Sequence, residues 1–393
     1  MSQQRISLSP DLTQLRDDGY EVAIRHNHLV ITGVPYVNAR AEIRLGTLVS
    51  DLSMSGDVTA KPGNHVCMFV GDFPCDQHGR PLEKLRHGDA DSSIGPGLVV
   101  NHSFSRKPTE GYTDYHHKMT TYVSLLSNHA KALDANVTAQ TRRVVENNDP
   151  ESPFQYLDTA SGRVGISAVT RKLELSRIGI FGVGGTGGYV LDLVAKTPVR
   201  EIAIFDGDTF LQHNAFRAPG APSIDELRAQ MSKVEYLKGI YSKMHRGIVG
   251  HDSYIDETTV QNIGQFDFGF ICMDPGTSKR LLVERLEQEG VPFIDVGMGV
   301  ELIDDMLTGM LRVTTSTATK RDHVREKKRI SFTDADQDNL YSKNIQIADL
   351  NAMNAALAVI KWKKFFGFYA DLEREHNALY LISGNTVING DEQ

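Results

Sequence analysis

The sequence contains few cysteines, which restricts the kinds of site that thiols could build. Only Cys67, Cys75 and Cys272 occur in 393 residues, and no two of them form a Cys-x-x-Cys pair. Three thiols provide no disulfide framework. They also exclude a zinc site made of four cysteines within one chain.

Long apolar runs and an excess of positive charge are also missing. No apolar segment approaches the roughly 20 residues that are needed to cross a bilayer. The polar start, Met1–Arg5, has no secretory apolar core. We therefore expect a cytoplasmic protein with no membrane partner. The formal net charge of −8 argues against a general nucleic-acid binder, although a local basic patch is compatible with it.

The sequence does contain a change in the pattern of predicted elements, at a polar, proline-bearing stretch, residues 146–153. Before it lie short segments with strand character, at 20–24, 28–31, 42–48, 66–70 and 98–100. One long helix is expected at 115–133. We predict a smaller, mostly β domain of unknown role at 1–148 and a separate domain at 154–393.

In the second region, apolar strands alternate with helical segments, which predicts an α/β domain with a doubly wound, mostly parallel sheet. Strands are expected at 178–181, 199–205, 248–254, 268–273 and 293–296. A capping-box pattern at Ser223–Glu226 predicts a helix that continues to about His245. A helix at 345–367 and one or two terminal strands complete the domain.

The most informative stretch is the glycine-rich segment Gly182–Gly188, between the strand at 178–181 and an amphipathic helix. Residues without side chains let a phosphate approach the backbone N–H groups at the N-terminus of that helix. We therefore expect a Rossmann-like domain that binds a nucleotide at Gly182, Gly184, Gly185 and Gly187. The glycine pattern alone is weak, because many unrelated nucleotide-binding proteins share it.

A second block of polar residues follows the next strand. Asp206 lies 18 positions after the glycine segment, at a strand end where a carboxylate accepts hydrogen bonds from ribose hydroxyls. Asp208 is assigned to the same nucleotide site. Arg217 offers a planar fork to phosphate oxygens, and Asn214 would orient a phosphate or the substrate carboxyl. The structural alternatives are a surface aspartate in a turn for Asp206, a loop salt bridge for Arg217, and a helix cap or an Asx turn for Asn214.

Asp274 follows the apolar strand at 268–273, which places its carboxylate at the rim of the sheet. A carboxylate in that position, together with waters, suits Mg²⁺. We assign Asp274 to the metal and to catalysis. The alternative is an N-cap for the helix that is predicted at 277–289.

Taken in order, these residues resemble the ThiF/MoeB/E1 superfamily of ubiquitin-like-protein activating enzymes. The resemblance covers about residues 163–369. It rests on the Gly-x-Gly-Gly-x-Gly segment, Asp206, Asn214 with Arg217, Lys233 and Asp274. It implies an ATP- and Mg²⁺-dependent adenylyltransferase that works as a homodimer. It also implies that Lys233 reaches the phosphates and that Arg163, upstream of the first strand, reaches into the site of the other subunit.

The chain departs from this superfamily at two places. Where relatives have Asp-Asn, it has Asp274-Pro275, which removes the neighbouring amide. Where many relatives carry a nucleophilic cysteine, the segment 297–320 has none. Cys75, which lies in a polar segment with His78, is then the cysteine considered for an exposed, activated thiolate. A free surface or packed thiol is the interpretation that we prefer for it.

The predicted function is the adenylation of the C-terminal carboxylate of a ubiquitin-like protein, with release of pyrophosphate and later transfer to a thiol or to an E2-like carrier. One alternative is adenylation of a peptide or a sulfur-carrier protein without any enzyme thioester. Another is a catalytically dead, nucleotide-binding partner subunit. An NAD-dependent dehydrogenase ranks last, because Asn214 and Arg217 have no role in binding a nicotinamide. The N-terminal domain resembles the uncharacterised leader of some bacterial E1-like proteins, from which we infer no activity.

Overall fold

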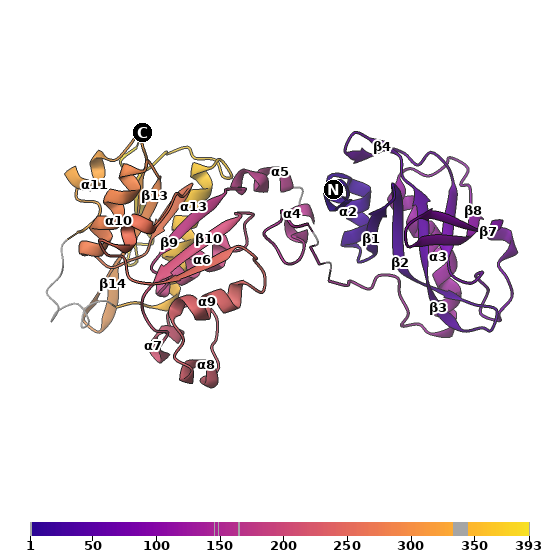
Figure 1. Ribbon diagram of the computed structural model, residues 1–393, viewed down its shortest axis with the longest axis horizontal. Coiled ribbons are helices and arrows are strands. Elements are labelled where there is room, and N and C mark those ends of the chain that lie inside the picture. Colours follow the sequence, from indigo (N-terminus) through magenta and orange to yellow (C-terminus); the bar gives the residue numbers. More distant parts are fainter. Residues whose placement is uncertain (1, 145, 148, 164–165, 333–344, 393) are drawn as a thin grey trace. The chain divides into compact units, whose positions relative to one another are not determined.

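The chain forms two compact units, seen here in a computed structural model (Figure 1). The structure describes residues 2–144, 146–147, 149–163, 166–332 and 345–392. The first unit comprises Met1–Val145 with Asp158–Ser167, and the second comprises Glu146–Leu157 with Ala168–Gln393. Within the described ranges, no helix is both long enough and apolar enough to span a membrane.

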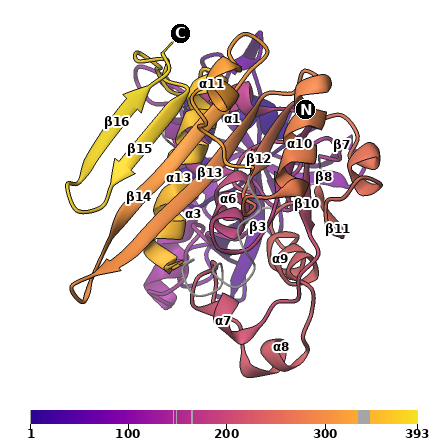
Figure 2. The same cartoon turned by 90° about the vertical axis from the view of Figure 1, so that its left-hand side faces the viewer.

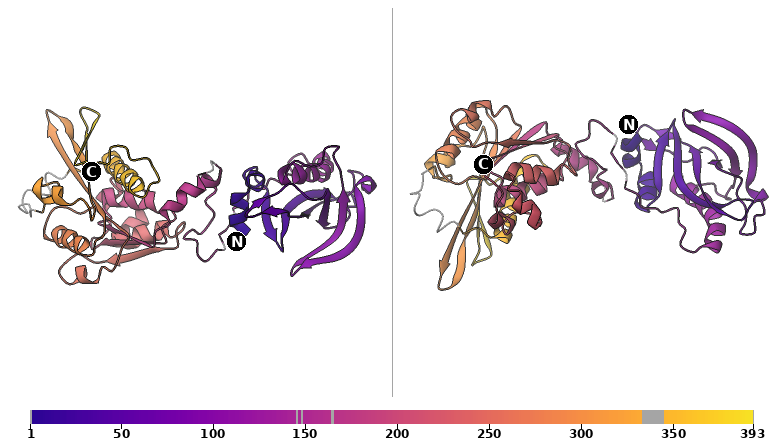
Figure 3. Two further views of the ribbon diagram at one scale, coloured as in Figure 1. Left: turned by 90° about the horizontal axis from the view of Figure 1, so that it is seen from above. Right: turned by 60° about the horizontal axis from the view of Figure 1, so that its bottom comes forward.

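The first unit is built on a six-stranded antiparallel sheet with the order β1-β2-β3-β6-β8-β7. Its strands are β1 (Glu21–Arg25), β2 (His28–Val37), β3 (Ile43–Asp51), β6 (Val66–Val70), β7 (Arg86–Gly95) and β8 (Leu98–Ser105). A two-stranded sheet pairs β4 (Met54–Ser55) with β5 (Val58–Thr59). Three register shifts bend the β7–β8 pair, whose curvature is visible in Figure 3. The prediction of a mostly β region is confirmed.

Helices cover this sheet and close its core. The chain begins with α1 (Ser2–Leu8) and α2 (Pro10–Asp17), and α4 (Thr159–Arg163) ends the unit. The long helix α3 (Tyr115–Leu133) begins where Asp114 accepts a hydrogen bond from the N–H of His117. Its buried side packs on the sheet and forms a core with the strand residues Phe69 and Phe104.

The second unit is organised around an eight-stranded sheet with the order β11-β10-β9-β12-β13-β14-β15-β16 (Figure 2). Its first five strands are β9 (Arg177–Phe181), β10 (Glu201–Asp206), β11 (Ile248–Asp252), β12 (Phe268–Ile271) and β13 (Phe293–Ile303). These run parallel to one another. The antiparallel strands are β14 (Met306–Ser316), β15 (Asn377–Leu381) and β16 (Thr386–Gly390).

Helices lie on both faces of this sheet, which confirms the Rossmann-like, doubly wound prediction. They are α6 (Gly185–Val194), α7 (Gln212–Ala215), α8 (Ile224–Arg228), α9 (Lys233–Tyr241), α10 (Thr277–Gln288), α11 (Asp322–Glu326) and α13 (Ala348–Phe365), with the short helix α5 (Ser167–Thr170) before β9. On one face, α6, α9 and α13 bury side chains such as Val190, Leu237 and Trp362 against the strands. On the other face, α10 packs Leu282 against Phe181 and its neighbours.

Two predicted elements of this unit have different bounds in the structure. The helix expected from Ser223 to His245 is two helices, because Phe210 N–H donates to the Met231 carbonyl and draws this segment out of a helical path. Ser232 then caps α9. The strand expected at 293–296 continues as β13 to Ile303 and turns into β14 through two residues with positive φ, Asp304 and Asp305.

Candidate active site

A cleft of about 1260 Å³ lies in the second unit at the carboxyl ends of the parallel strands. Residues that directly follow β9, β10 and β12 line it. Strands β9 and β12 are neighbours in the sheet, and the strand order reverses between them. Doubly wound sheets bind their ligands at this switch point.

The glycines of the loop after β9 serve two purposes, close packing and access to the backbone. A Cβ on Gly187 would overlap the carbonyl oxygen of Gly182, and a Cβ on Gly185 would overlap the amide of Asn351. These glycines are therefore needed for close packing of the loop. Gly184 is different, because its Cβ would meet nothing nearer than Lys233 Nζ, 4.0 Å away. The backbone at Gly184, just before α6, is therefore open to an approaching ligand.

Asp206 joins the glycine loop to the loop after β10. Its Oδ2 accepts a hydrogen bond from the N–H of Val183 at 2.9 Å, and its Oδ1 accepts one from the N–H of Asp208 at 3.0 Å. The side chain is 9% exposed. Asp206 thus fixes the relative position of two loops while it lines the cleft.

Lys233 begins α9, and its own N–H donates to the carbonyl of Asp208 at 2.9 Å. This backbone bond brings Lys233 Nζ within 2.5 Å of Asp208 Oδ2 and 3.4 Å of Asp206 Oδ1. The Tyr254 hydroxyl donates to Asp208 Oδ1 at 2.7 Å. Burial acts to raise the pKa of Asp208, but the hydrogen bonds from Lys233 and Tyr254 outweigh it and hold that pKa below its usual value. No local sequence pattern indicated that Tyr254 belongs to this site.

Two buried donors from the segment around α7 enter the same cleft. Asn214 is 2% exposed, and its Oδ1 accepts the N–H of Leu211 at 2.8 Å, which is the helix-cap role. Its Nδ2 has no hydrogen-bond partner among the described residues, and neither does Arg217 Nε. Buried donors without partners are costly, so they indicate a place for a ligand with acceptor atoms.

Two cations and an acid act on a histidine in this part of the cleft. Burial lowers the pKa of His213, and the charges of Arg217 and Lys233 lower it further. His213 lines the cleft together with both cations.

Asp274 lies in the cleft just after β12. The residue at the N-cap of α10 is Gly276, so the alternative that Asp274 caps this helix is wrong. Within the described ranges, no group of three or more His, Cys, Asp or Glu side chains is placed to hold a metal ion. Arg163 ends α4 in the first unit, and its side chain lies outside the part of the chain whose side chains are described.

Helix α13 contributes two residues to the cleft that the sequence analysis missed. Asn351 Oδ1 accepts a hydrogen bond from Thr186 Oγ1 at 2.8 Å, and its Nδ2 donates to the Arg217 carbonyl at 3.1 Å. Asn354 Nδ2 donates to the carbonyl of Gly297 at 3.0 Å. Both asparagines are 1% exposed. Two asparagines three positions apart in an apolar helix were the available signal, since buried amides need partners.

Comparison with protein families matches residues 160–357 to the ThiF family. The chain belongs to the ThiF family. Residues 10–159 match a domain of unknown function (DUF6791). No curated protein matches the sequence.

Several solved structures are similar to this ThiF protein. E. coli MccB with succinimide is 18% identical, with 57% of this chain and 66% of that chain covered and a TM-score of 0.44. E. coli MccB with AMPCPP and MccA is 17% identical, with 62% and 72% covered and a TM-score of 0.45. PaaA is 16% identical, with 57% and 75% covered and a TM-score of 0.45. The chain thus spans about two thirds of the length of the first of these structures.

The cysteines of this ThiF protein are unsuited to thioester chemistry as folded. Cys75 is 1% exposed, and its pKa is raised by burial and then by Asp76 and Asp72. The segment folds inward and places acids beside the thiol, which agrees with the preferred interpretation of Cys75 as an unreactive, packed thiol and not with an activated thiolate. Burial also raises the pKa of Cys67, to about 12, and that of Cys272.

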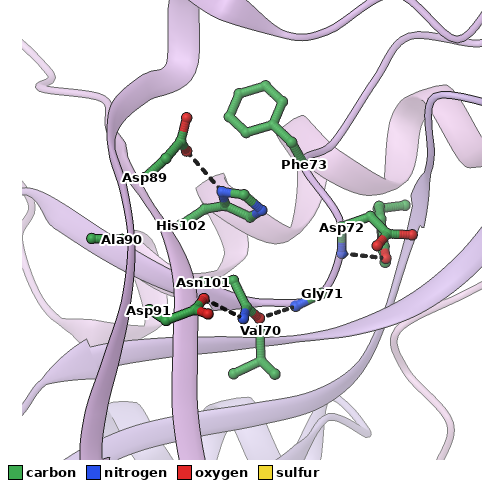
Figure 4. A pocket seen from close by; sticks show the side chains of 10 residues that line it. Val70, Gly71, Asp72, Phe73, Asp89, Ala90, Asp91, Asn101 and His102 are labelled. Carbon is green, nitrogen blue, oxygen red and sulfur yellow. Dashed lines mark hydrogen bonds and ion pairs between the residues drawn. The ribbon is translucent and has the colours of Figure 1, made fainter.

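The first unit of the ThiF protein has a separate hollow of about 770 Å³ (Figure 4). Asp89 pairs with His102 Nδ1 at 2.7 Å, and Asn101 Nδ2 donates to Asp91 at 3.0 Å. Burial, and then the charge of Arg86, lowers the pKa of His102. Two pairs of polar side chains in this hollow therefore satisfy each other.

Proposed function

We propose that this ThiF protein is an ATP- and Mg²⁺-dependent adenylyltransferase that activates the C-terminal carboxylate of a ubiquitin-like protein. The observation that carries the proposal is the convergence of an open glycine backbone, Arg217 and Lys233 in one cleft at the switch point of the sheet. That set suits a triphosphate, because it combines backbone donors with two cations. The adenylation domain would comprise residues 154–393.

ATP fits the residues that are present. The backbone at Gly184 would receive the phosphates, with Arg217 and Lys233 beside them, and Asp206 would accept hydrogen bonds from the ribose. The unpartnered donors Arg217 Nε and Asn214 Nδ2 match the acceptor-rich triphosphate. Lys233 would exchange part of its pairing with Asp208 for a phosphate oxygen.

Mg²⁺ fits through Asp274. A single carboxylate suffices when phosphate oxygens and waters complete the coordination. The ion would supply charge neutralisation at the phosphates of the departing pyrophosphate.

The proposed reaction transfers the adenylyl group of ATP, with its α-phosphorus, to the substrate carboxylate. A carboxylate oxygen of the substrate attacks the α-phosphorus of ATP, the bond from that phosphorus to the bridging oxygen breaks, and pyrophosphate leaves with its electron pair. The product is an acyl adenylate. Arg217 and Lys233 would stabilise the charge that accumulates on the phosphate oxygens during this step.

A second candidate function is adenylation of a peptide or a sulfur-carrier protein without an enzyme thioester. The burial of Cys67 and Cys75 and the raised pKa values of all three cysteines favour it, since a thioester needs an accessible thiolate. A thiol acceptor would then belong to a separate, E2-like carrier. We also propose a homodimer in which Arg163 reaches the site of the other subunit.

Pyrophosphate exchange tests this proposal. The full chain is incubated with ATP, Mg²⁺, labelled pyrophosphate and the small-polypeptide fraction of an extract of its own cells. We expect label in ATP, and at least about a hundredfold loss for Arg217→Ala, because a charge-assisted contact with the transition state is removed. Arg228→Gln is the matched control, since Arg228 is 76% exposed on α8. Undiminished exchange in Arg217→Ala would refute the assignment of Arg217.

Calorimetry with ATP–Mg²⁺ and with NAD separates the competing classes. Binding of ATP without exchange would favour the catalytically dead partner subunit. Binding of NAD alone would contradict the proposal altogether.

A further inference from the structure

The segment that follows α11 forms part of the wall of the cleft in the second unit. This wall segment, residues 327–332, contributes Ser331 to the lining of the cleft. On either side of Ser331, Ile330 and Phe332 pack in the core cluster that contains Phe181, the last residue before the glycine loop. Among the described residues, no backbone–backbone hydrogen bond involves residues 329–332. Side-chain contacts must therefore fix the position of this wall.

Asp391 supplies such contacts from a distant part of the chain. It directly follows β16, the yellow edge strand in Figure 2. Its carboxylate is fully buried and forms ion pairs with Lys327 Nζ and with Arg329 Nε, the latter at 2.8 Å. These partners precede it by 64 and 62 positions in the sequence. Asp391 therefore attaches the wall segment to the end of the sheet.

The backbone holds Asp391 at a fixed point of that sheet. Its carbonyl accepts a hydrogen bond from the N–H of His376 at 3.2 Å, directly before β15. Its φ of 57° lies in the left-handed region, which an aspartate adopts more easily than most residues with a side chain. The turn in the backbone directs the carboxylate toward the wall segment instead of toward the next position of a strand.

The carboxylate of Asp391 depends on both cations, and they depend on it. Burial acts to raise the pKa of Asp391, but the hydrogen bonds from Lys327 and Arg329 outweigh it and hold that pKa below its usual value. A buried charge is tolerated only when it is paired. The side chains of Lys327 and Arg329 are 53% and 30% exposed, so both could turn to water if the carboxylate were removed. The wall segment would then lose its attachment to the sheet.

We propose that Asp391 is a positioning residue of the nucleotide site. Through Lys327 and Arg329 it holds the wall segment so that Ser331 contacts the bound nucleotide. Asp391 does not itself line the cleft, so it acts only through the wall segment. The inference rests on the proposed function and deepens it, since it makes the affinity for ATP depend on a carboxylate outside the cleft.

The experiment compares two identical substitutions, Asp391→Asn and Asp371→Asn. Asp371 is the matched control, because it also lies beside two cations of the second unit, Lys361 Nζ at 2.8 Å and Lys364 Nζ at 3.6 Å, none of which lines the cleft. Calorimetry measures the affinity of the full chain for AMPCPP with Mg²⁺. We expect Asp391→Asn to weaken it by at least about fivefold and Asp371→Asn to leave it unchanged. Urea midpoints from Trp362 fluorescence measure how much stability each variant loses, separately from its affinity.

Hydrogen exchange reports the position of the wall segment without any nucleotide. In Asp391→Asn, peptides that cover residues 327–332 should exchange at least about tenfold faster than in the wild type or in Asp371→Asn, because the segment opens more often. Arg329→Gln removes only one of the two ion pairs, so it should fold even if Asp391→Asn does not, and it should change affinity and exchange in the same directions. Ser331→Ala should weaken AMPCPP by about threefold and leave the exchange unchanged, since it removes the contact and keeps the attachment.

Unchanged affinity for AMPCPP in Asp391→Asn, or unchanged exchange of the wall segment, would overturn the proposal. Equal losses of affinity in Asp371→Asn would also overturn it, because they would show a general effect of a lost ion pair. Unchanged affinity in Ser331→Ala would overturn the contact with the nucleotide. If the wild type does not bind AMPCPP, the proposed function fails. If the wild type and Asp391→Asn bind it equally well, only this inference fails.

Discussion

The two units of this protein each contain a polar depression, but they differ in what their polar groups contact. In the hollow of the first unit, Asp89 pairs with His102 and Asn101 pairs with Asp91. In the cleft of the second unit, atoms of Asn214, Arg217 and Asn354 are buried without partners among the described residues. A depression whose groups are satisfied is complete as folded, whereas unsatisfied buried groups await a ligand.

The largest expected effect comes from substitutions in the glycine loop that lines the cleft of the second unit. Gly187→Ala would drive a Cβ into the Gly182 carbonyl, so we expect the second unit to lose several kcal/mol of stability and to stop binding ATP. Gly184→Ala meets no atom nearer than 4.0 Å, so it should fold normally and weaken ATP binding at least about tenfold. Trp362 is the sole tryptophan and is buried in this unit, so its fluorescence in urea reports the unfolding. A fully stable Gly187→Ala would contradict the loop geometry.

A smaller effect is expected from the hollow of the first unit. Asp89→Asn removes a carboxylate that pairs with His102 and Arg86, so it should destabilise the first unit by about 1 kcal/mol. Near-ultraviolet circular dichroism of the tyrosines measures this change, and calorimetry should find the affinity for ATP unaltered. A weaker affinity for ATP would show that the hollow and the cleft are not independent. It would contradict the contrast that is drawn between them.

The smallest effect concerns pH. His245 is fully buried; its Nδ1 accepts the Gly247 N–H at 3.1 Å and its Nε2 donates to the Val199 carbonyl at 2.8 Å, so the ring is neutral. Burial lowers its pKa from the ordinary 6.5. As the pH falls below 6.5, the unfolded chain therefore takes up a proton that the folded unit does not, and the stability of the second unit decreases. Urea midpoints from Trp362 fluorescence should fall between pH 7.5 and 5.5, and a constant midpoint would contradict a neutral His245.

Much of the nucleotide end of the cleft could be predicted from the sequence, because its parts are local. The glycine loop and Asp206 each follow directly from the end of a strand, whereas Lys233 was assigned through the resemblance and lies at a helix start that was not predicted. Helix α3 has the predicted bounds, since its apolar periodicity and its Asp114 cap are also local signals. The roles of these cleft residues are tested by the experiments above.

The rest depended on contacts between distant segments. Asn351 and Thr186 form a hydrogen bond although they are 165 positions apart in the sequence, and no local pattern predicts that pairing. The break between α8 and α9 comes from the backbone pairing of Met231 with Phe210, which stops the helix that the intact capping box of Ser223 and Glu226 begins from continuing to His245. Strand β7 has no buried residue, so it lacks the apolar alternation by which strands are recognised. Cys75 lies in a polar stretch that nevertheless folds inward.

The central claim is that the second unit converts a polypeptide C-terminus into an acyl adenylate. The most direct measurement is mass spectrometry of the small-polypeptide fraction after incubation with the full chain, ATP and Mg²⁺. The account predicts a polypeptide that carries AMP on its C-terminal carboxylate, formed by the wild type and by Arg228→Gln but not by Arg217→Ala. ATP that is bound and never transferred as AMP to any polypeptide would contradict it.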